Sequence, residues 1–176
     1  MTGFFRSLDS CLQDIIFTDI YEAGCGEGYV TAHIGNYYGN GGVLHASDIS
    51  EECIEKAKKQ CPQAEFIAGS IYEIKKPSNS YDLVIACEVL EHLDEPAIAM
   101  NELLRLSKKY VLVSVPNEPI WRICNVLRGK YLFHLGNTPG HIKHWSASSF
   151  FRFVGTHCKV LKQENPLPWT MLLCEK

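Results

Sequence analysis

The chain has 176 residues, of which 46% are hydrophobic and 21% are charged, a size and composition that fit one globular domain and exclude a disordered chain. The sequence contains no run of about 18 apolar residues, which a membrane-spanning helix would need. The formal net charge is −3, but the first 104 residues carry 17 acidic against 6 basic side chains, and the remainder carries 3 against 11. The basic C-terminal part favours an anionic partner there, or it is simply a solvated basic surface.

Eight cysteines are present and none forms a CxxC pair. Residues Met1 to Asp9 lack the basic region and the apolar region of a secretory signal. We therefore expect free, mostly buried thiols and a cytoplasmic protein.

Short apolar runs alternate with helical patterns through residue 115, which is typical of βαβ units and a mainly parallel sheet. In chain order, the sequence predicts a strand at 17–22, a helix at 29–38, a strand at 43–47, a helix at 50–60, strands at 64–68 and 81–87, a helix at 96–107 and a strand at 110–115. The strand at 81–87 is almost entirely apolar, so we expect it to be buried on both faces.

The C-terminal part is less regular. Region 117–145 has no clean strand period, and we interpret it as a lid or substrate insertion within a single domain that spans residues 1–176. Beyond it, Ser146 is expected to cap a short helix through residue 154, and 158–163 and 168–175 suit a pair of strands at the sheet edge.

The strongest local signal is the segment Glu22-Ala23-Gly24-Cys25-Gly26-Glu27-Gly28, where the first strand gives way to a helix. Glycines at this point let the backbone approach a ligand and present amides at a helix N-terminus. The spacing is GxGxG rather than the GxGxxG of dinucleotide sites, and the acid at Glu22 would repel a pyrophosphate. The turn therefore favours an amino-acid tail with an ammonium group; the alternative is a turn without a ligand.

Two further strand ends lie on the same edge of the predicted sheet. Asp48 follows the glycine turn by about 20 residues, and a carboxylate there can accept hydrogen bonds from both hydroxyls of a ribose. Alone, Asp48 would be a helix cap, but together with the glycine turn it predicts ribose binding. After the third strand, Gly69 leaves room for a planar ring and Ile71 offers it an apolar face.

A third strand end, in the segment Tyr81-Asp82-Leu83-Val84-Ile85-Ala86-Cys87-Glu88-Val89-Leu90-Glu91-His92-Leu93, completes a motif order that resembles the class I S-adenosylmethionine-dependent methyltransferases. The likeness covers residues 17–115. It implies an α/β, Rossmann-like fold with a doubly wound seven-stranded sheet, mostly parallel with an antiparallel strand seven. It also implies S-adenosyl-L-methionine as the cofactor.

The resemblance assigns residues to the parts of that cofactor. Glu22, Gly24 and Gly26 would hold the methionine end, and Asp48 the ribose. The adenine would lie at Ile49, Ser70 and Ile71, and the sulfonium near Cys87, Glu88 and Val89. Cys25, Gly28 and Gly69 complete the predicted cofactor site.

Two departures from the family pattern concern how tightly the cofactor is held. Ser70 stands where many relatives have an Asp that bonds the adenine amino group. Only about 16 residues precede the first strand, where most relatives have a longer helical segment over the cofactor. We therefore expect a more open and more weakly binding cofactor site.

The reaction itself needs little from the protein, because a sulfonium is already a good leaving group and the enzyme mainly aligns the acceptor. An oxygen acceptor would still gain from a base or a metal ion. Glu88 and His141 are the candidates for a catalytic role.

A metal site is the main open question. On a helical turn Glu88 shares a face with Glu91 and His92, and two carboxylates with an imidazole can hold Mg²⁺, Mn²⁺ or Zn²⁺. The pattern is also similar to the O-methyltransferases of ubiquinone biosynthesis and to the enzymes that 2′-O-methylate the 3′ ends of small RNAs. The latter resemblance implies a Glu/Glu/His/His site with His141 as fourth ligand, or His144 in its place. The alternative is a metal-free cleft lined by Glu88, with His92 packed and hydrogen-bonded.

The leading interpretation is a methyltransferase that acts on an oxygen or nitrogen of a small, anionic or lipophilic acceptor. One alternative is a metal-assisted RNA 2′-O-methyltransferase, which the basic C-terminal part favours although no aromatic and basic stripe for stacking bases is evident. Another is a cofactor-binding or regulatory domain without turnover. The amphipathic stretch 120–135 could close over an acceptor, touch a membrane surface or pack on the sheet.

Overall fold

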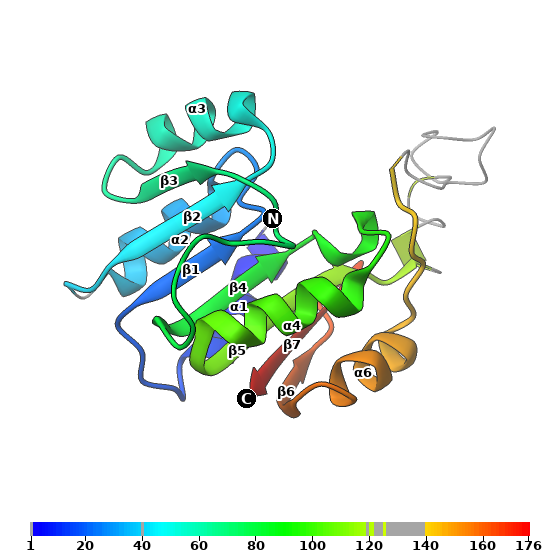
Figure 1. The fold of residues 1–176 in the computed structure, drawn as a ribbon. Helices are drawn as coiled ribbons and strands as arrows, with labels where there is room; N and C mark the ends of the chain where they lie inside the picture. The colour runs from blue at the N-terminus through cyan, green and yellow to red at the C-terminus, as the bar shows by residue number, and fades with distance from the viewer. Residues whose placement is uncertain (1, 40, 119, 122–124, 126–139) are drawn as a thin grey trace.

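The computed structural model describes residues 2–39, 41–118, 120–121, 125 and 140–176. These residues form a seven-stranded sheet in the order β3-β2-β1-β4-β5-β7-β6, with helices on both faces (Figure 1). Strands β1 to β5 are parallel, β7 runs antiparallel to β5, and β6 runs antiparallel to β7. The predicted Rossmann-like, doubly wound sheet with an antiparallel strand seven is confirmed.

The strands are β1 (Ile20–Ala23), β2 (Leu44–Asp48), β3 (Glu65–Ala68), β4 (Tyr81–Cys87), β5 (Ser107–Pro116), β6 (Lys159–Glu164) and β7 (Trp169–Glu175). The helices are α1 (Thr2–Leu12), α2 (Tyr29–Tyr38), α3 (Glu51–Gln60), α4 (Pro96–Leu106) and α6 (Ala147–Gly155), with a short 3₁₀ helix η1 (Leu90–His92).

The central strand β4 shows how the two layers are held together. Leu83 and Ile85 are fully buried among α1 and α2, whereas Val84 and Ala86 are fully buried on the face that α4 and α6 cover. Side chains of successive strand residues point to opposite faces, so a run of apolar residues fills both cores. The expectation that this strand is buried on both faces is confirmed.

Helix ends follow the expected side-chain chemistry. The Ser50 hydroxyl accepts a hydrogen bond from the backbone amide of Cys53 at the start of α3. Ser146 caps α6 in the same way, accepting from the amide of Ser149, whose hydroxyl bonds back to the Ser146 amide. Such caps satisfy amides that the helix leaves unpaired, typically worth about 1 kcal/mol.

The N-terminus differs from the sequence analysis, which assigned no element to it. Residues 2–12 form α1, which packs on β6 and β7. Its buried residues recur at helical spacing on one face and are Phe4, Leu8, Cys11 and Leu12. The hydroxyl of Ser10 donates to Glu164, and the ammonium of Lys162 donates to the Ser10 carbonyl. The end of the chain is therefore tied to the far edge of the sheet.

Strand β5 is longer than the predicted 110–115. It begins at Ser107, which pairs with Tyr81 of β4, and ends at Pro116, which pairs with Trp169 of β7. The sheet thus extends β5 at both ends through long-range pairing, which a local pattern does not encode.

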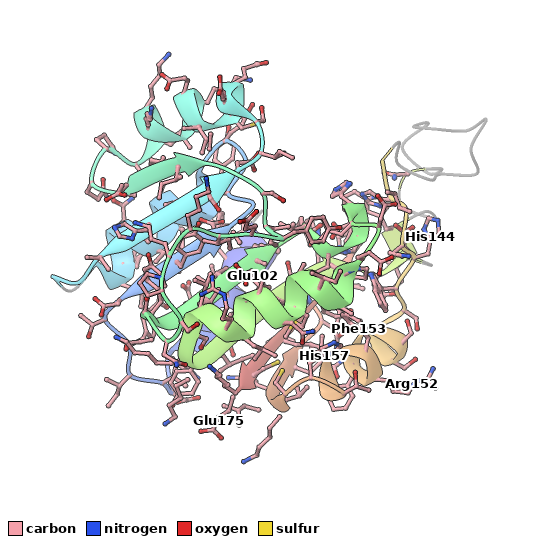
Figure 2. The ribbon with its side chains drawn as sticks, in the orientation of Figure 1. Glu102, His144, Arg152, Phe153, His157 and Glu175 are labelled. Carbon is pink, nitrogen blue, oxygen red and sulfur yellow. The ribbon has the colours of Figure 1, made fainter. Side chains whose placement is uncertain are left out.

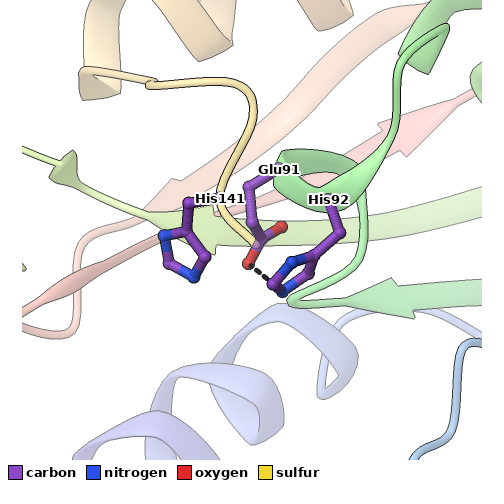
Figure 3. Close-up of side chains that lie close together, drawn as sticks. All are labelled: Glu91, His92 and His141. Carbon is purple, nitrogen blue, oxygen red and sulfur yellow. Dashed lines mark ion pairs between the residues drawn. The ribbon is translucent and has the colours of Figure 1, made fainter. Parts of the chain in front are cut away.

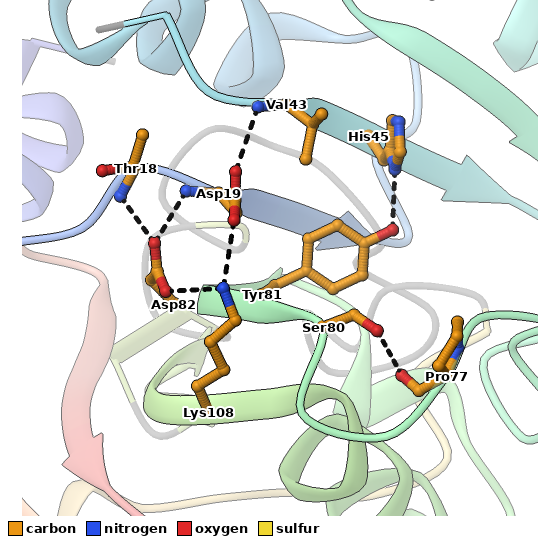
Figure 4. Close-up of polar contacts among 9 residues, drawn as sticks. All are labelled: Thr18, Asp19, Val43, His45, Pro77, Ser80, Tyr81, Asp82 and Lys108. Carbon is orange, nitrogen blue, oxygen red and sulfur yellow. Dashed lines mark hydrogen bonds and ion pairs between the residues drawn. The ribbon is translucent and has the colours of Figure 1, made fainter.

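Charges that are separated along the sequence meet in the fold. The ammonium of Lys108 lies 3.0 Å from Asp19 Oδ2 and 2.9 Å from Asp82 Oδ1, at the amino ends of the central strands (Figure 4). The other oxygen of Asp82 accepts hydrogen bonds from the backbone amides of Thr18 and Asp19. Basic charge of the C-terminal part here stabilises acidic charge of the N-terminal part.

Other basic side chains also form ion pairs with acidic side chains. Arg105 forms an ion pair with Glu102 on α4 (labelled in Figure 2) and also donates to two backbone carbonyls. Lys109 and Lys159 both lie within 4.0 Å of Glu175. The charge split along the sequence is therefore partly cancelled in the folded chain.

Most of region 117–145, including nearly all of the amphipathic stretch 120–135, lies outside the described residues. The lid and membrane-surface interpretations of that stretch stay predictions. Among the residues that the structure describes, no helix is long and apolar enough to cross a bilayer.

Candidate functional site

A cleft of about 420 Å³ opens at the carboxyl ends of the parallel strands. Its walls are the glycine turn after β1, the end of β2, the loop after β3 and the turn after β4. The lining residues are Gly24, Gly26, Asp48, Ile49, Gly69, Ser70, Ile71, Tyr72, Glu88, Val89, His92 and Leu93. Because β1 pairs with both β2 and β4, the cleft lies at the point where the strand order reverses, and open α/β sheets bind ligands there.

Nine of the 13 residues predicted for the cofactor line this cleft. The four that do not are Glu22, Cys25, Gly28 and Cys87. Sequence analysis missed Tyr72 and Leu93, and it considered His92 only as a metal ligand or a packed residue. Tyr72 directly follows Ile71, and Leu93 directly follows His92, so their positions next to predicted site residues were the available signal.

The glycine turn packs closely against neighbouring residues at two of its glycines and leaves open space at the third. Gly24, Gly26 and Gly28 all have left-handed backbone angles, with φ of 75°, 52° and 84°. A Cβ at Gly24 would lie 2.3 Å from Cγ2 of Val89, and one at Gly28 would lie 2.8 Å from Cα of Ala57, whereas one at Gly26 would meet nothing within 4 Å. Gly24 and Gly28 thus permit close packing, while Gly26 leaves space in the cleft.

Glu22 lies behind the turn rather than in its lining. Its side chain is buried and accepts a hydrogen bond from the Thr31 hydroxyl of α2. Burial, together with the charge of Asp48, raises the pKa of Glu22 to about 8, against the hydrogen bond from Thr31 that lowers it. A buried carboxyl with a raised pKa would gain most from a nearby cation.

Asp48 joins two parts of the cleft. Its Oδ2 accepts a hydrogen bond from the Gly26 amide at 2.8 Å, and its Oδ1 accepts one from the Ser50 amide at 2.9 Å. Each carboxylate oxygen can accept a second hydrogen bond, so Asp48 can hold the turn and still receive ligand hydroxyls. The Ser70 hydroxyl accepts one hydrogen bond from the amide of Tyr72, which leaves it one lone pair and its own proton for a ligand.

Glu88 connects the cleft to a second cavity. It has a left-handed backbone, φ 60°, which is costly for a residue with a Cβ and often marks a functional position. Its Oε1 accepts a hydrogen bond from the Ser114 hydroxyl at 3.1 Å. Burial raises the pKa of Glu88 to about 8, while hydrogen bonds from Ser114 and Trp169 oppose the shift. Glu88 lines both the cleft and a smaller cavity of about 130 Å³.

Three of the four predicted metal ligands meet beside the cleft. Ligand atoms of Glu91, His92 and His141 all lie within 4.8 Å of one another (Figure 3). The Glu91 carboxylate lies between the two rings, 4.0 Å from Nε2 of His92. Glu91 is buried, and neither of its oxygens has a hydrogen-bond partner among the described residues. Burial and the charges of Glu88 and Glu118 raise the pKa of Glu91 well above its usual range.

Both histidines of this group are fixed through Nδ1. The Nδ1 of His92 is hydrogen-bonded to the Gly140 carbonyl at 2.9 Å. The Nδ1 of His141 is bonded to the buried Glu118 carboxylate at 2.6 Å, and Nδ1 of His144 lies 3.6 Å from the same oxygen. Outer partners of this kind orient metal-binding imidazoles and leave Nε2 as the ligand atom. Glu118 was not singled out as a site residue from the sequence.

Glu88 does not belong to this group, which corrects the prediction of a four-ligand site containing it. The prediction assumed that residues 88 to 92 form a regular helical turn. Instead the backbone of Glu88 is left-handed and only η1, Leu90–His92, is helical. The Glu88 side chain accordingly turns to Ser114. His144 lies near Glu118 rather than in the group, so it does not replace His141.

The sheet order and the carboxyl-edge cleft define a Rossmann-like fold of the class I methyltransferase type. The profile of the family described as a methyltransferase domain matches residues 21–113, and the chain belongs to this family. Its match ends near the carboxyl end of β5, so it covers every described residue that lines the cleft, but not α1, α6, β6 or β7.

Curated relatives and solved structures agree with this assignment. The chain is 33% identical over 122 residues to an uncharacterized methyltransferase of Schizosaccharomyces pombe, covering 61% of this chain and 44% of that protein. It is 31% identical over 102 residues to a Mycolicibacterium smegmatis protein named as a probable S-adenosylmethionine-dependent methyltransferase, covering 57% and 38%. The chain thus matches less than half the length of either relative.

The fold is shared with a magnesium protoporphyrin IX methyltransferase from Synechocystis, solved with bound S-adenosylhomocysteine. The two structures superpose with a TM-score of 0.72 at 18% identity, over 99% of this chain and 84% of the other. At that identity the likeness concerns the fold.

Proposed function

We propose that this chain binds S-adenosyl-L-methionine in the carboxyl-edge cleft and transfers its methyl group to an oxygen or nitrogen of a small, anionic or lipophilic acceptor. The observation that carries the proposal is the set of nine predicted cofactor residues that line one cleft of about 420 Å³. This volume falls in the range of small-molecule sites, roughly 300–1,000 Å³. Membership of the methyltransferase-domain family supports the assignment.

The residues present fit the three parts of such a cofactor. The open space at Gly26 admits the methionine portion, with Glu22 behind the turn to favour the ammonium group through charge. The Asp48 carboxylate receives the ribose hydroxyls, and Ile49, Ile71 and the neighbouring Tyr72 offer apolar surface to the adenine. When bound, the cofactor supplies an electrophilic methyl group on a sulfonium. The chain's own task is to orient the acceptor and exclude water.

Calorimetry with S-adenosylmethionine and S-adenosylhomocysteine tests the cofactor assignment. We expect Asp48→Ala to weaken binding about 30- to 150-fold, because charge-assisted hydrogen bonds contribute about 2–3 kcal/mol. The matched control is Asp14→Ala, since Asp14 is exposed and lies outside the cleft lining. Binding that is absent in the wild type, or equal in wild type and Asp48→Ala, would refute the proposal. Binding without methyl transfer to any acceptor would favour the regulatory domain instead.

A metal-assisted reaction is the second candidate. The buried Glu91 carboxylate favours it, because this group has no hydrogen-bond partner in the part of the chain that the structure describes. Two imidazoles and a carboxylate suit Zn²⁺ or Mn²⁺ and leave coordination positions open. In this proposal Glu91, His92 and His141 hold the ion, and Glu118 fixes the ring of His141. A bound divalent ion would polarise an acceptor hydroxyl next to the cleft, which His92 also lines.

Mn²⁺ titration followed by electron paramagnetic resonance and by thermal unfolding tests the metal site. We expect saturable binding that raises the unfolding temperature, and loss of both effects in Glu91→Gln. Glu95→Gln is the matched control, because Glu95 is exposed and stands just beyond the cluster. No stabilisation of the wild type at saturating Mn²⁺ or Zn²⁺ would contradict the metal proposal and leave the cofactor proposal standing.

An RNA acceptor would combine this metal site with phosphate contacts. Binding of a short RNA should then weaken steeply as salt rises, because released counterions drive phosphate recognition. Lys108 and Arg105 form ion pairs with acidic side chains, so they are less available to bind RNA phosphates. A flat salt response would contradict the RNA alternative and favour a small molecule.

A further inference from the structure

A small cavity lies next to the cofactor cleft and is walled almost entirely by apolar groups. It measures about 130 Å³, and its lining residues are Phe4, Phe5, Tyr29, Val30, Cys87, Glu88 and Trp169. We call it the aromatic pocket. Its residues come from α1, the start of α2, the end of β4 and the start of β7. Among the described residues of the lining, Glu88 is the only carboxylate and none carries a basic side chain.

The aromatic side chains of the pocket are arranged edge to face. The ring centroids of Phe4 and Trp169 are 5.5 Å apart at 78°, and those of Phe4 and Phe5 are 5.9 Å apart at 89°. Aromatic pairs prefer such geometry because the electron-rich face of one ring attracts the edge of another. A dry apolar cavity of about 150 Å³ can hold benzene. The size and the walls therefore fit one planar ring.

Glu88 places a carboxylate where the pocket meets the cleft. Among the described residues, it is the one that lines both cavities. Its side chain is held by the Ser114 hydroxyl of β5, and its left-handed backbone fixes the turn on which it stands. A polar group on a ring in the pocket would accordingly meet Glu88 on the side that faces the cofactor.

We propose that the aromatic pocket is the acceptor subsite and takes a phenol, with the ring between the aromatic side chains and the hydroxyl at Glu88. The inference rests on the proposed function, because the neighbouring cleft must supply the methyl group. The phenolic oxygen forms the new bond to the methyl carbon, the carbon–sulfur bond breaks with its electron pair passing to sulfur, and the hydroxyl proton goes to the Glu88 carboxylate. The products are a neutral thioether and a methyl aryl ether.

The lining disfavours other small acceptors. An anionic group would meet the carboxylate of Glu88 and, among the described residues of the lining, no compensating cation. An alkyl amine is protonated at neutral pH and lacks a free electron pair for the methyl group. A phenolic hydroxyl is neutral, with a pKa near 10, whereas burial raises the pKa of Glu88 to about 8. Above pH 8 Glu88 is therefore a carboxylate while the phenol is still protonated, so the carboxylate can accept the hydroxyl proton.

The binding test uses phenol and cyclohexanol, which are alike in size but differ in planarity, added to the complex with S-adenosylhomocysteine. We expect phenol to bind at least fivefold more tightly than cyclohexanol. Tyr29→Ala should weaken phenol about fivefold and leave S-adenosylhomocysteine affinity within twofold. Tyr37→Ala is the matched control, because Tyr37 is an exposed residue of the same helix outside the pocket. Circular dichroism checks that both variants fold.

The transfer test replaces S-adenosylhomocysteine with S-adenosylmethionine and measures anisole by mass spectrometry. We expect the wild type to form anisole and Glu88→Gln to bind phenol but lose anisole formation at least 100-fold. Equal binding of phenol and cyclohexanol, an effect of Tyr37→Ala equal to that of Tyr29→Ala, or absence of anisole would overturn the inference. If S-adenosylhomocysteine binds normally in those cases, the proposed function survives; if it does not bind at all, both fail.

Discussion

The cofactor cleft and the aromatic pocket share Glu88, but the chain builds them in opposite ways. Every described residue that lines the cleft lies between Gly24 and Leu93, either at the end of a parallel strand or in the segment that follows it. The pocket joins Phe4, at one end of the chain, to Trp169, at the other. Parallel strands deliver their carboxyl ends to one edge by topology, so short motifs suffice to build the cleft. The pocket instead depends on the docking of α1 and β7.

The largest effect on stability is expected at the glycine turn, where one glycine permits close packing and another leaves space for the ligand. Gly28→Ala should lower the free energy of unfolding by about 2–5 kcal/mol, since its Cβ would overlap Ala57 and its backbone is left-handed. Gly26→Ala should cost only about 1–2 kcal/mol, because its Cβ meets open space, but should weaken S-adenosylhomocysteine binding. Urea unfolding and calorimetry measure both. Equal losses of stability would show that the two glycines do not play separate roles.

The next effect concerns the aromatic pocket. Phe4→Ala should lower the free energy of unfolding by about 3 kcal/mol, because Phe4 is buried against Trp169 and truncation leaves a cavity. Hydrogen exchange should then rise in α1 while the affinity for S-adenosylhomocysteine stays unchanged. Phe151→Ala, at an exposed position of α6, is the control and should change stability by less than about 0.5 kcal/mol. Loss of cofactor binding in Phe4→Ala would mean that the two regions are not independent.

The third effect is a pH dependence common to both regions. The pKa values of Glu22 and Glu88 are raised to about 8 by burial, so the folded chain without ligand holds protons that the unfolded chain releases above about pH 4.5. The stability from each group is present below that pH and is lost as pH rises through 8, with a limiting slope of about 1.4 kcal/mol per pH unit. Unfolding temperatures from pH 5 to 8 should fall less in Glu22→Gln than in the wild type. An unchanged slope would contradict a raised pKa of the buried Glu22 carboxyl.

The sequence predicted the fold and most of the cleft because both follow from local patterns. Residues 29–38 and 81–87 were placed with the observed bounds, and the glycine turn and Asp48 were assigned to the same edge of the sheet. In each case the hydrophobic period, a capping residue or a backbone that only glycine adopts readily decides the structure.

The features that the sequence analysis did not predict depend on tertiary contacts. The spacing of Phe4, Leu8, Cys11 and Leu12 was a visible helical signal for α1, but the surface it packs on is formed by β6 and β7, about 150 residues away. The four-ligand metal site was predicted from an assumed helical turn, and the left-handed backbone of Glu88 breaks that turn. Glu118 reaches His141 only through the fold and has no motif of its own.

The central claim, that the cleft between the glycine turn and the turn after β4 is the cofactor site, is tested most directly by a crystal structure with S-adenosylhomocysteine. The account predicts ligand density along this cleft, with the ribose hydroxyls bonded to Asp48 and the sulfur facing Glu88. It would be contradicted by a well-ordered empty cleft at saturating ligand, or by density in the separate cavity that Tyr21 and Ser47 line.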